Sequence, residues 1–129
     1  MGNRGPDWLA QAGHDLEHAR NALQAGDYDW ACFAAHQAGE KALKGLFLRL
    51  GGEAWGHVLT RLLMDLESRL EIPEMLQQAT RRLDKHYIPT RYPNGFDAGA
   101  PYEFYTADEA RQAIQDAERI YEFCQQSFR

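Results

Sequence analysis

Apolar residues recur at every third or fourth position along nearly the whole chain, the spacing that places side chains on one face of an α-helix. This periodicity predicts five helices, over about residues 7–25, 28–50, 57–69, 73–85 and 106–127. The alternating pattern typical of β-strands is almost absent. Because the turns between most of these helices are short, we expect an all-α fold, an up-and-down antiparallel bundle of four to five helices.

Capping residues and glycines mark the predicted helix boundaries. Asp7 is placed to cap the first helix, and Gly26 is placed to end it. Gly51-Gly52 stops the second helix, and Thr106-Ala-Asp-Glu109 has the pattern of a capping box at the start of the last. Only the connection over about 86–105 is long. Loops of that length are uncommon in compact domains unless they have a function.

The apolar faces of these helices predict one core. The second helix carries a run of small residues that let a neighbouring helix approach closely. These small residues are Ala31, Ala34, Ala35, Ala38 and Ala42. Larger inward-facing side chains are expected from the other helices. They include Trp8, Leu9 and Leu16, then Val58, Leu59 and Leu62, then Met75, Leu76 and Leu83.

Composition narrows the class of protein. The chain has 129 residues, of which 44% are hydrophobic and 26% charged, as expected for a single globular domain over residues 1–129. No stretch approaches the ~20 apolar residues of a membrane-spanning helix, and MGNRGPDW lacks the apolar core of a signal peptide. The net charge of −5 argues against a general nucleic-acid-binding surface but leaves room for a local basic patch.

The first candidate site is the polar face of the second helix. Phe33, Gln37 and Lys41 follow one another at i,i+4, and Glu40 and Lys44 form a second i,i+4 pair with the acid first. One interpretation is a solvated, salt-bridged face. The other places Gln37 and Lys41 beside a ligand phosphate or an opposing loop. His36, one position before Gln37, points away from this row and is expected to be structural.

The second candidate site is at the end of the fourth helix, where Arg81 and Arg82 precede His86. Metal-independent RNA cleavage needs a group with a pKa near neutrality to move the 2′-hydroxyl proton, which His supplies. It also needs a fixed cation to stabilise the phosphorane, which Arg supplies. Arg82 and His86 share a helix face, whereas Arg81 would meet His86 only through a distorted helix end or a second subunit. The alternative is that these cations merely complement the helix dipole.

The third candidate is the long connection itself. Tyr87, Arg91 and Tyr92 surround Pro89 and Pro93, which prevent the helix from continuing. The aromatic rings could stack on a base while the cation holds a phosphate. They could equally pin the loop onto the bundle through their rings and hydroxyls.

Other chemistry finds little support. His14 and His18 are an i,i+4 pair without further ligands, so we expect neither a metal site nor a cofactor. Cys32 and Cys124 stand alone inside predicted helices. They indicate two buried thiols in a reducing compartment, and hence a cytoplasmic protein.

Over about residues 7–127 the chain resembles a HEPN domain (higher eukaryotes and prokaryotes nucleotide-binding), of the small prokaryotic type. Two strings carry most of the resemblance, and shorter matches accompany them. The main strings are Gln37-Ala38 with Glu40-Lys41-Ala42-Leu43-Lys44, and Leu83-Asp84 through Tyr87-Ile88-Pro89-Thr90-Arg91-Tyr92-Pro93. The shorter matches are Asp15-Leu16, Gly26-Asp27-Tyr28, Trp30-Ala31, Phe33 and His57.

The resemblance implies a helical bundle that is usually a homodimer, with rival functions. One is a nucleotide- or RNA-binding module that partners a minimal nucleotidyltransferase in a toxin–antitoxin-like pair. Phosphate contacts would then come from Lys41, Lys44 and Arg91, with Tyr87 or Tyr92 stacking.

Another function is that of a toxin, a metal-independent endoribonuclease whose Arg-x4-6-His motif is completed across the dimer. Arg81 and His86 fit that spacing, although Arg82 stands where the motif usually has a polar residue, often Asn. A third is a helical interaction protein without catalytic activity.

Overall fold

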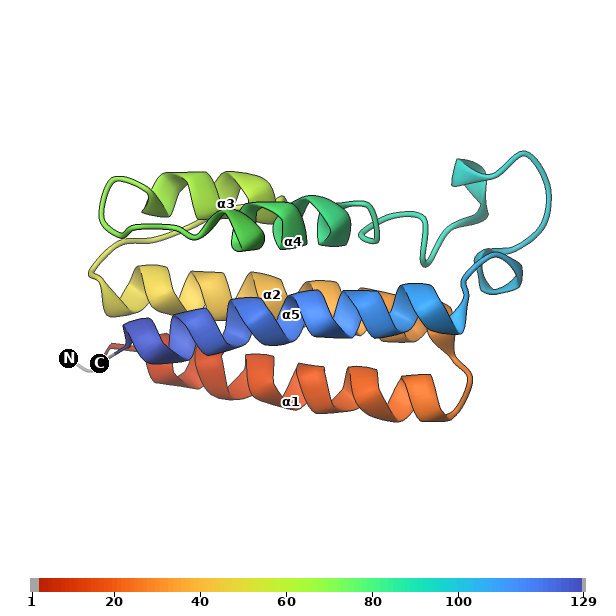
Figure 1. Ribbon diagram of the computed structural model, residues 1–129, viewed down its shortest axis with the longest axis horizontal. Coiled ribbons are helices and arrows are strands. Elements are labelled where there is room, and N and C mark those ends of the chain that lie inside the picture. Colours follow the sequence, from red (N-terminus) through yellow and green to blue (C-terminus); the bar gives the residue numbers. More distant parts are fainter. Residues whose placement is uncertain (1–2, 129) are drawn as a thin grey trace.

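The computed structural model describes residues 3–128, and it is a bundle of antiparallel helices (Figure 1). The helices are α1 (Gly5–Gln24), α2 (Tyr28–Arg49), α3 (Leu59–Leu66), α4 (Glu74–Asp84) and α5 (Ala107–Ser127). Two short 3₁₀ turns, η1 (Pro93–Gly95) and η2 (Pro101–Glu103), lie in the long connection. No strand occurs among the described residues. The predicted all-α bundle of five helices with one long loop is confirmed.

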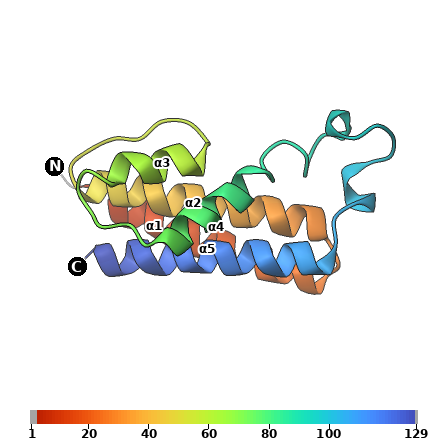
Figure 2. The same cartoon turned by 45° about the horizontal axis from the view of Figure 1, so that its top comes forward.

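The three long helices α1, α2 and α5 run side by side, and the shorter α3 and α4 pack over them (Figures 1 and 2). The α1 helix begins, and α5 ends, at the same end of the bundle, whereas the connection between α4 and α5 projects beyond the opposite end. None of the described helices is both long enough and apolar enough to span a membrane.

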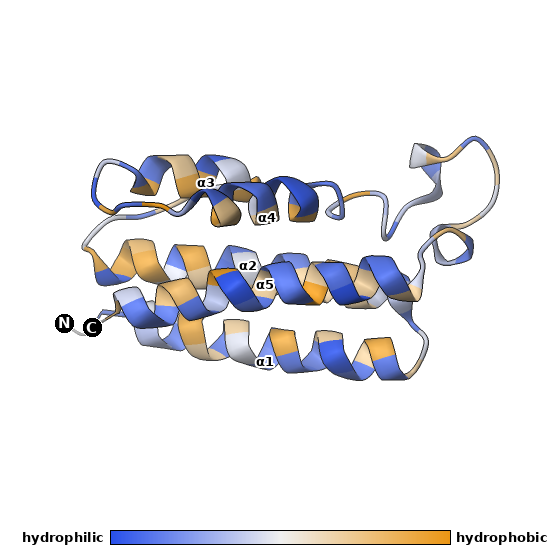
Figure 3. Ribbon diagram, in the orientation of Figure 1, coloured by the Kyte–Doolittle hydropathy of each residue, from blue (hydrophilic) through white to orange (hydrophobic). Residues whose placement is uncertain are grey.

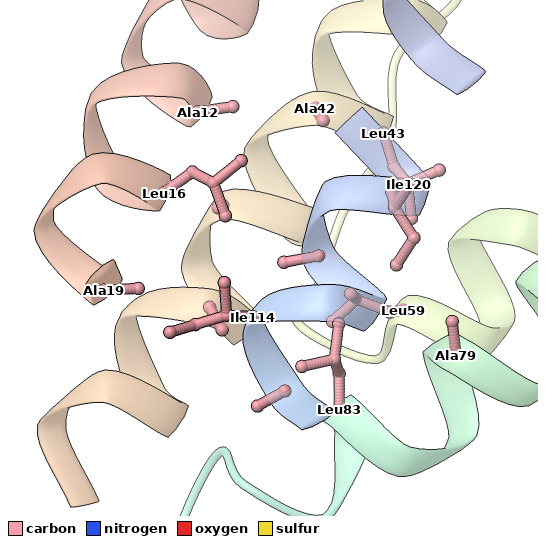
Figure 4. Packing of buried hydrophobic residues seen from close by; sticks show 14 of the residues in the cluster. Ala12, Leu16, Ala19, Ala42, Leu43, Leu59, Ala79, Leu83, Ile114 and Ile120 are labelled. Atoms are coloured by element: carbon pink, nitrogen blue, oxygen red, sulfur yellow. The ribbon is translucent and has the colours of Figure 1, made fainter. Parts of the chain in front are cut away.

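The core lies between α2 and its neighbours. Hydrophilic and hydrophobic residues alternate along the helices (Figure 3), as expected for helices with one buried face. Leu59, Leu83 and Ile120 meet from three different helices, and Leu16 points in from α1 (Figure 4). The alanines predicted to face inward from the second helix are all buried.

The small residues allow α1 and α2 to touch through their backbones. A methyl group added at Gly45 would lie only 3.0 Å from the Gly5 carbonyl oxygen and 3.1 Å from the Cβ of Trp8. This close approach leaves no space for an indole ring between the helices. The prediction that Trp8 faces the core is therefore wrong, and its side chain is 37% exposed at the surface.

Other inward predictions fail at helix ends. Val58 is 47% exposed because it is the residue before α3 rather than part of it. Met75 is 51% exposed in the first turn of α4, where Leu76 takes the buried position. Asp7 is not the cap of α1: Arg4 is the N-cap residue, and Asp7 lies in the first turn, where it accepts a hydrogen bond from Arg4 Nε at 2.6 Å.

The boundary signals otherwise agree with the structure. The capping box at Thr106 and Glu109 is formed, and Gly26 and Gly51 have φ angles of 81° and 87°, a conformation that glycine adopts without strain. The third helix is shorter than predicted. Its N-terminus is capped by Asp84, whose carboxylate accepts hydrogen bonds from the backbone of Leu59 at 2.7 Å and of Thr60 at 3.1 Å. The end of α4 thus fixes the start of α3.

Candidate functional site

The segment Thr90-Arg91-Tyr92-Pro93 is tied to the chain that leaves α4. The Thr90 hydroxyl donates a hydrogen bond to the His86 carbonyl at 2.7 Å, and Thr90 is almost fully buried. The Arg91 guanidinium donates from Nε at 3.0 Å and from Nη2 at 2.7 Å to the carbonyl of Tyr87. Two side chains of the segment therefore satisfy the carbonyls of His86 and Tyr87, which lie just beyond the end of α4.

Arg91 also joins the loop to α2. Its guanidinium carbon lies 4.2 Å from the ring centre of Phe33, 4.7 Å from that of Tyr87 and 5.1 Å from that of Tyr92. These are cation–π distances. We call Phe33, Tyr87, Arg91 and Tyr92 the Arg91 cluster.

An open groove of about 330 Å³, here the α1–α2 groove, begins at the same Phe33 ring. It is lined by Asp15, His18, Trp30, Phe33, Ala34, Gln37 and Lys41. The structure thus brings most of the predicted binding residues together, since Gln37 and Lys41 lie along the groove and the Arg91 cluster lies at its Phe33 end. Trp30 is 51% exposed and adds a second aromatic ring.

Lys41 is held in place within this groove. Its Nζ donates to the Asp15 carboxylate at 2.5 Å, and both side chains are partly buried. Asp15 leaves the ammonium two further donors. The groove therefore offers an anchored cation, an amide and aromatic surfaces.

Lys44 does not join this group. It donates to Glu40 at 3.2 Å, as the i,i+4 pairing predicts, and Glu40 lies 2.8 Å from Nδ1 of His57. Lys44 lines a different groove, formed by the beginning of α1, the end of α2 and the connection to α3. Lys41 and Lys44 consequently serve different surfaces, although they are only one helical turn apart.

His36 is structural, as expected. It is fully buried, and its Nε2 donates to the carbonyl of His57 at 2.9 Å. Its ring lies 5.0 Å from that of Tyr87, which also stacks on His57 at 4.7 Å. Burial lowers the pKa of His36, so the imidazole is neutral at neutral pH.

A single chain does not bring Arg81 and His86 together. Arg81 is exposed and lines a groove between α3 and α4. His86 is half-buried on the side of α5, with Nδ1 3.4 Å from the hydroxyl of Tyr105. Burial lowers the pKa of His86, which leaves a neutral ring that could accept a proton.

The neighbouring Arg82 is engaged elsewhere. Its guanidinium makes two hydrogen bonds of 2.8 Å to the carboxylate of Asp116, which is fully buried in α5. This ion pair raises the pKa of Arg82, chiefly through the hydrogen bond to Asp116. The α4 helix ends at Asp84, so His86 lies beyond it and the predicted helix face shared by Arg82 and His86 does not form. The Arg82 guanidinium is already paired with Asp116.

Sequence reasoning missed three residues of the α1–α2 groove, namely Asp15, His18 and Trp30. Asp15 and His18 lie one turn apart on α1 and face the α2 residues. The family resemblance includes Asp15, but the pairing with Lys41 depends on how the two helices align, which no local pattern encodes. His18 stands out in the sequence only beside His14, as a possible metal pair. No group of three or more metal-ligating side chains is present within residues 3–128.

Comparison with known proteins gives consistent matches. A family model described as "HEPN domain" matches residues 6–127. The crystal structure of TT1696 from Thermus thermophilus is 50% identical, with a TM-score of 0.95 over 98% of this chain and 99% of that one. The crystal structure of ST0689, described as an archaeal HEPN homologue, is 40% identical, with a TM-score of 0.85 over 100% of both chains.

The name of a more distant relative states a function. The protein "Putative toxin MJ1304" of Methanocaldococcus jannaschii is 24% identical over 124 residues, covering 89% of this chain and 82% of that protein.

Proposed function

The chain belongs to the HEPN domain family, and we propose that it is a nucleotide- or RNA-binding module acting at the α1–α2 groove and the Arg91 cluster. One observation carries the proposal. Phe33 lines the groove that contains Lys41 and also lies 4.2 Å below the Arg91 guanidinium, so an aromatic platform lies between two cations. Stacking surfaces combined with fixed cations are what a base and its phosphate require.

The side chains suggest how such a ligand would lie. Trp30 and the edge of Phe33 offer faces for a base, and the amide of Gln37 can donate to and accept from a base edge. Lys41, held by Asp15, is placed for a phosphate. Arg91 uses two of its donors on the Tyr87 carbonyl and keeps others free.

The charge of the protein limits the mode of binding. At a net charge of −5 it does not attract a polyanion from a distance, and the groove contains one carboxylate beside its lysine. Binding should therefore involve one or two phosphates, with a shallow dependence on salt concentration. A nucleotide or a short single-stranded segment fits this better than duplex RNA.

The experiment is a calorimetric titration of the protein with ATP and with a short single-stranded RNA. Lys41→Met keeps the apolar stem of the side chain and removes the charge, and it should weaken binding about tenfold. Lys85→Met is the matched control, because Lys85 is an exposed lysine outside the groove. The proposal would be refuted if neither ATP nor the RNA gave heat at ~mM concentration, or if Lys41→Met and Lys85→Met weakened binding equally.

The wider role includes partners. We propose that the protein forms a homodimer and works with a minimal nucleotidyltransferase in a toxin–antitoxin-like pair in the cytoplasm. The support is the family resemblance and the name of the M. jannaschii relative. Sedimentation at ~10 µM, alone and with a co-expressed nucleotidyltransferase, tests both parts. A monomer that does not co-sediment with the enzyme would contradict them.

The alternative function, a metal-independent endoribonuclease, has a geometric requirement that one chain does not satisfy by itself. Since Arg81 and His86 occupy different faces of one chain, cleavage would need Arg81 of a second copy to reach His86. Incubation with total RNA in EDTA distinguishes the alternatives. Background cleavage by both the native chain and His86→Ala would exclude the enzyme, whereas activity lost in His86→Ala would favour it.

A further inference from the structure

His57 is held in a fixed orientation in the connection between α2 and α3. Its Nδ1 lies 2.8 Å from a carboxylate oxygen of Glu40, and its ring stacks on Tyr87 with the ring centres 4.7 Å apart. Its backbone carbonyl accepts a hydrogen bond from Nε2 of His36 at 2.9 Å. Ring and backbone are thus both fixed, although the side chain is 52% exposed. The proposed function uses neither His57 nor Glu40.

The contacts of Glu40 decide where the His57 ring carries its proton. Glu40 is buried, and its second oxygen accepts a hydrogen bond from Nζ of Lys44 at 3.2 Å. A glutamate paired with an ammonium is a carboxylate, which only accepts hydrogen bonds, so Nδ1 of His57 is the protonated nitrogen. Nε2 then carries the lone pair, and it makes no hydrogen bond within residues 3–128. A carboxylate on one ring nitrogen and an open lone pair on the other is the arrangement of an activated imidazole.

The other histidines lack this combination. His36 is fully buried, and its Nε2 is used as a donor. His86 is half-buried against α5. His14 and His18 are exposed, but no side-chain hydrogen bond within residues 3–128 orients either ring. His57 therefore differs from all four in being both oriented by a carboxylate and open to solvent.

A positive charge without a carboxylate partner lies on the other contact of Tyr87. The guanidinium carbon of Arg91 is 4.7 Å from the centre of the ring on which His57 stacks. Arg91 donates its hydrogen bonds to a backbone carbonyl and makes no ion pair within the described residues. Its charge favours an anionic group at His57 over a neutral one.

Two carboxylates are near His57, and both are balanced. Glu40 is paired with Lys44. Asp84 caps the backbone of Leu59, two residues beyond His57, and so faces the positive end of the α3 dipole. The charge of Arg91 is therefore not cancelled by either of them.

We propose that His57 is a phosphoryl-acceptor site that reacts with small phosphoryl donors such as phosphoramidates. The Nε2 lone pair forms the bond to phosphorus while the bond from phosphorus to the protonated leaving nitrogen breaks. The amine, or ammonia, departs with that electron pair. The Nδ1 proton stays between the ring and Glu40, which stabilises the positive charge that the ring gains. Glu40 is thus a positioning residue for the imidazole.

The test is the labelling of the full chain by potassium phosphoramidate at pH ~8, where exposed imidazoles are neutral. Samples are quenched in alkali, and the labelled histidines are mapped by mass spectrometry over time. Because a carboxylate that orients an imidazole typically changes its reactivity 10- to 100-fold, we expect His57 to be labelled at least about tenfold faster than His14 or His18. His57→Gln should remove the fast phase and leave the slow labelling unchanged.

A second comparison examines Glu40. Glu40→Gln keeps the shape and one acceptor but removes the charge, so labelling of His57 should slow about tenfold while the rates of His14 and His18 stay the same. Glu17→Gln, which changes an exposed carboxylate between those two histidines, is the matched control.

Thermal melts show whether each variant is folded, and the comparison of histidines within the native chain needs no variant. Two results would overturn the proposal. One is labelling of His57 no faster than that of His14 and His18 in the native chain. The other is an unchanged rate at His57 in folded Glu40→Gln.

Discussion

Replacing Arg82 alone by an apolar residue should destabilise the protein strongly. Replacing Arg82 and its partner Asp116 together should destabilise it much less. Asp116 is fully buried, and its carboxylate accepts two bonds of 2.8 Å from Arg82 and one of 3.1 Å from Gln112. The side chain of Arg82 itself is 39% exposed. Arg82→Met therefore leaves a buried carboxylate with a single neutral donor.

The expected cost follows from that geometry. Removing one partner of a buried ion pair typically destabilises a protein by about 3–5 kcal/mol. Because Arg82 is partly exposed, water can reach the vacated position, and we expect a loss of about 3 kcal/mol in the free energy of unfolding. For a chain of 129 residues this corresponds to a fall of about 12 °C in the melting temperature. The double variant Arg82→Met/Asp116→Leu should recover most of the loss, since no unpaired charge remains.

Urea unfolding followed by circular dichroism measures these differences. Arg81→Met is the matched control, because Arg81 is exposed and makes no ion pair within residues 3–128. It should change the free energy of unfolding by less than about 0.5 kcal/mol. The reasoning would be refuted if Arg82→Met cost no more than this control, or if the double variant were as unstable as Arg82→Met alone.

Further predictions concern the cap, the buried histidine and the thiols. Asp84→Ala removes the cap of α3 and should cost about 2 kcal/mol in urea unfolding, against almost nothing for the exposed Asp97→Ala; equal losses would contradict the capping role. Burial lowers the pKa of His36 in the folded chain. As the pH decreases below ~6.5, the unfolded chain takes up a proton first, so the stability of the folded chain decreases as the pH decreases. His36→Gln should show a smaller fall in melting temperature between about pH 7.5 and 5.5, and an undiminished fall would exclude His36 as a cause. Burial raises the pKa of Cys32 to about 12 and also raises that of Cys124, so neither should react with a disulfide reagent until urea unfolds the chain.

Helix positions were predictable from the sequence because each depends on local signals. The 3.6-residue period, the capping box at Thr106 and the glycine at position 26 act within one or two helical turns. Two of the errors occur where a distant residue decides the outcome. The start of α3 is set by Asp84 from the end of α4, and the exposure of Trp8 is set by Gly45 on another helix. Neither contact can be predicted from the residues that are adjacent in the sequence.

The candidate site was predictable in its residue types but not in its grouping. Gln37 and Lys41 could be placed on one helix face from their spacing, and Arg91 could be placed in a loop by its prolines. That Arg91 lies over Phe33, or that Lys41 and Lys44 serve different grooves, depends on the packing of the loop and of α1 against α2. The ion pair of Arg82 with Asp116 likewise could not be predicted from local sequence, because it joins α4 to α5.

Arg91 illustrates why the two interpretations of the loop are not exclusive. Its guanidinium satisfies the Tyr87 carbonyl and covers the Phe33 ring, so it stabilises the loop whether or not a ligand binds. Replacing Arg91 would then release the Phe33 end of the groove and remove a cation at the same time. A loss of nucleotide binding in such a variant could not distinguish contact from architecture. Lys41 contacts only Asp15 in the hydrogen-bonding network described, so its replacement leaves the loop intact. The binding test therefore depends on Lys41, and unfolding measurements are the ones that report on Arg91.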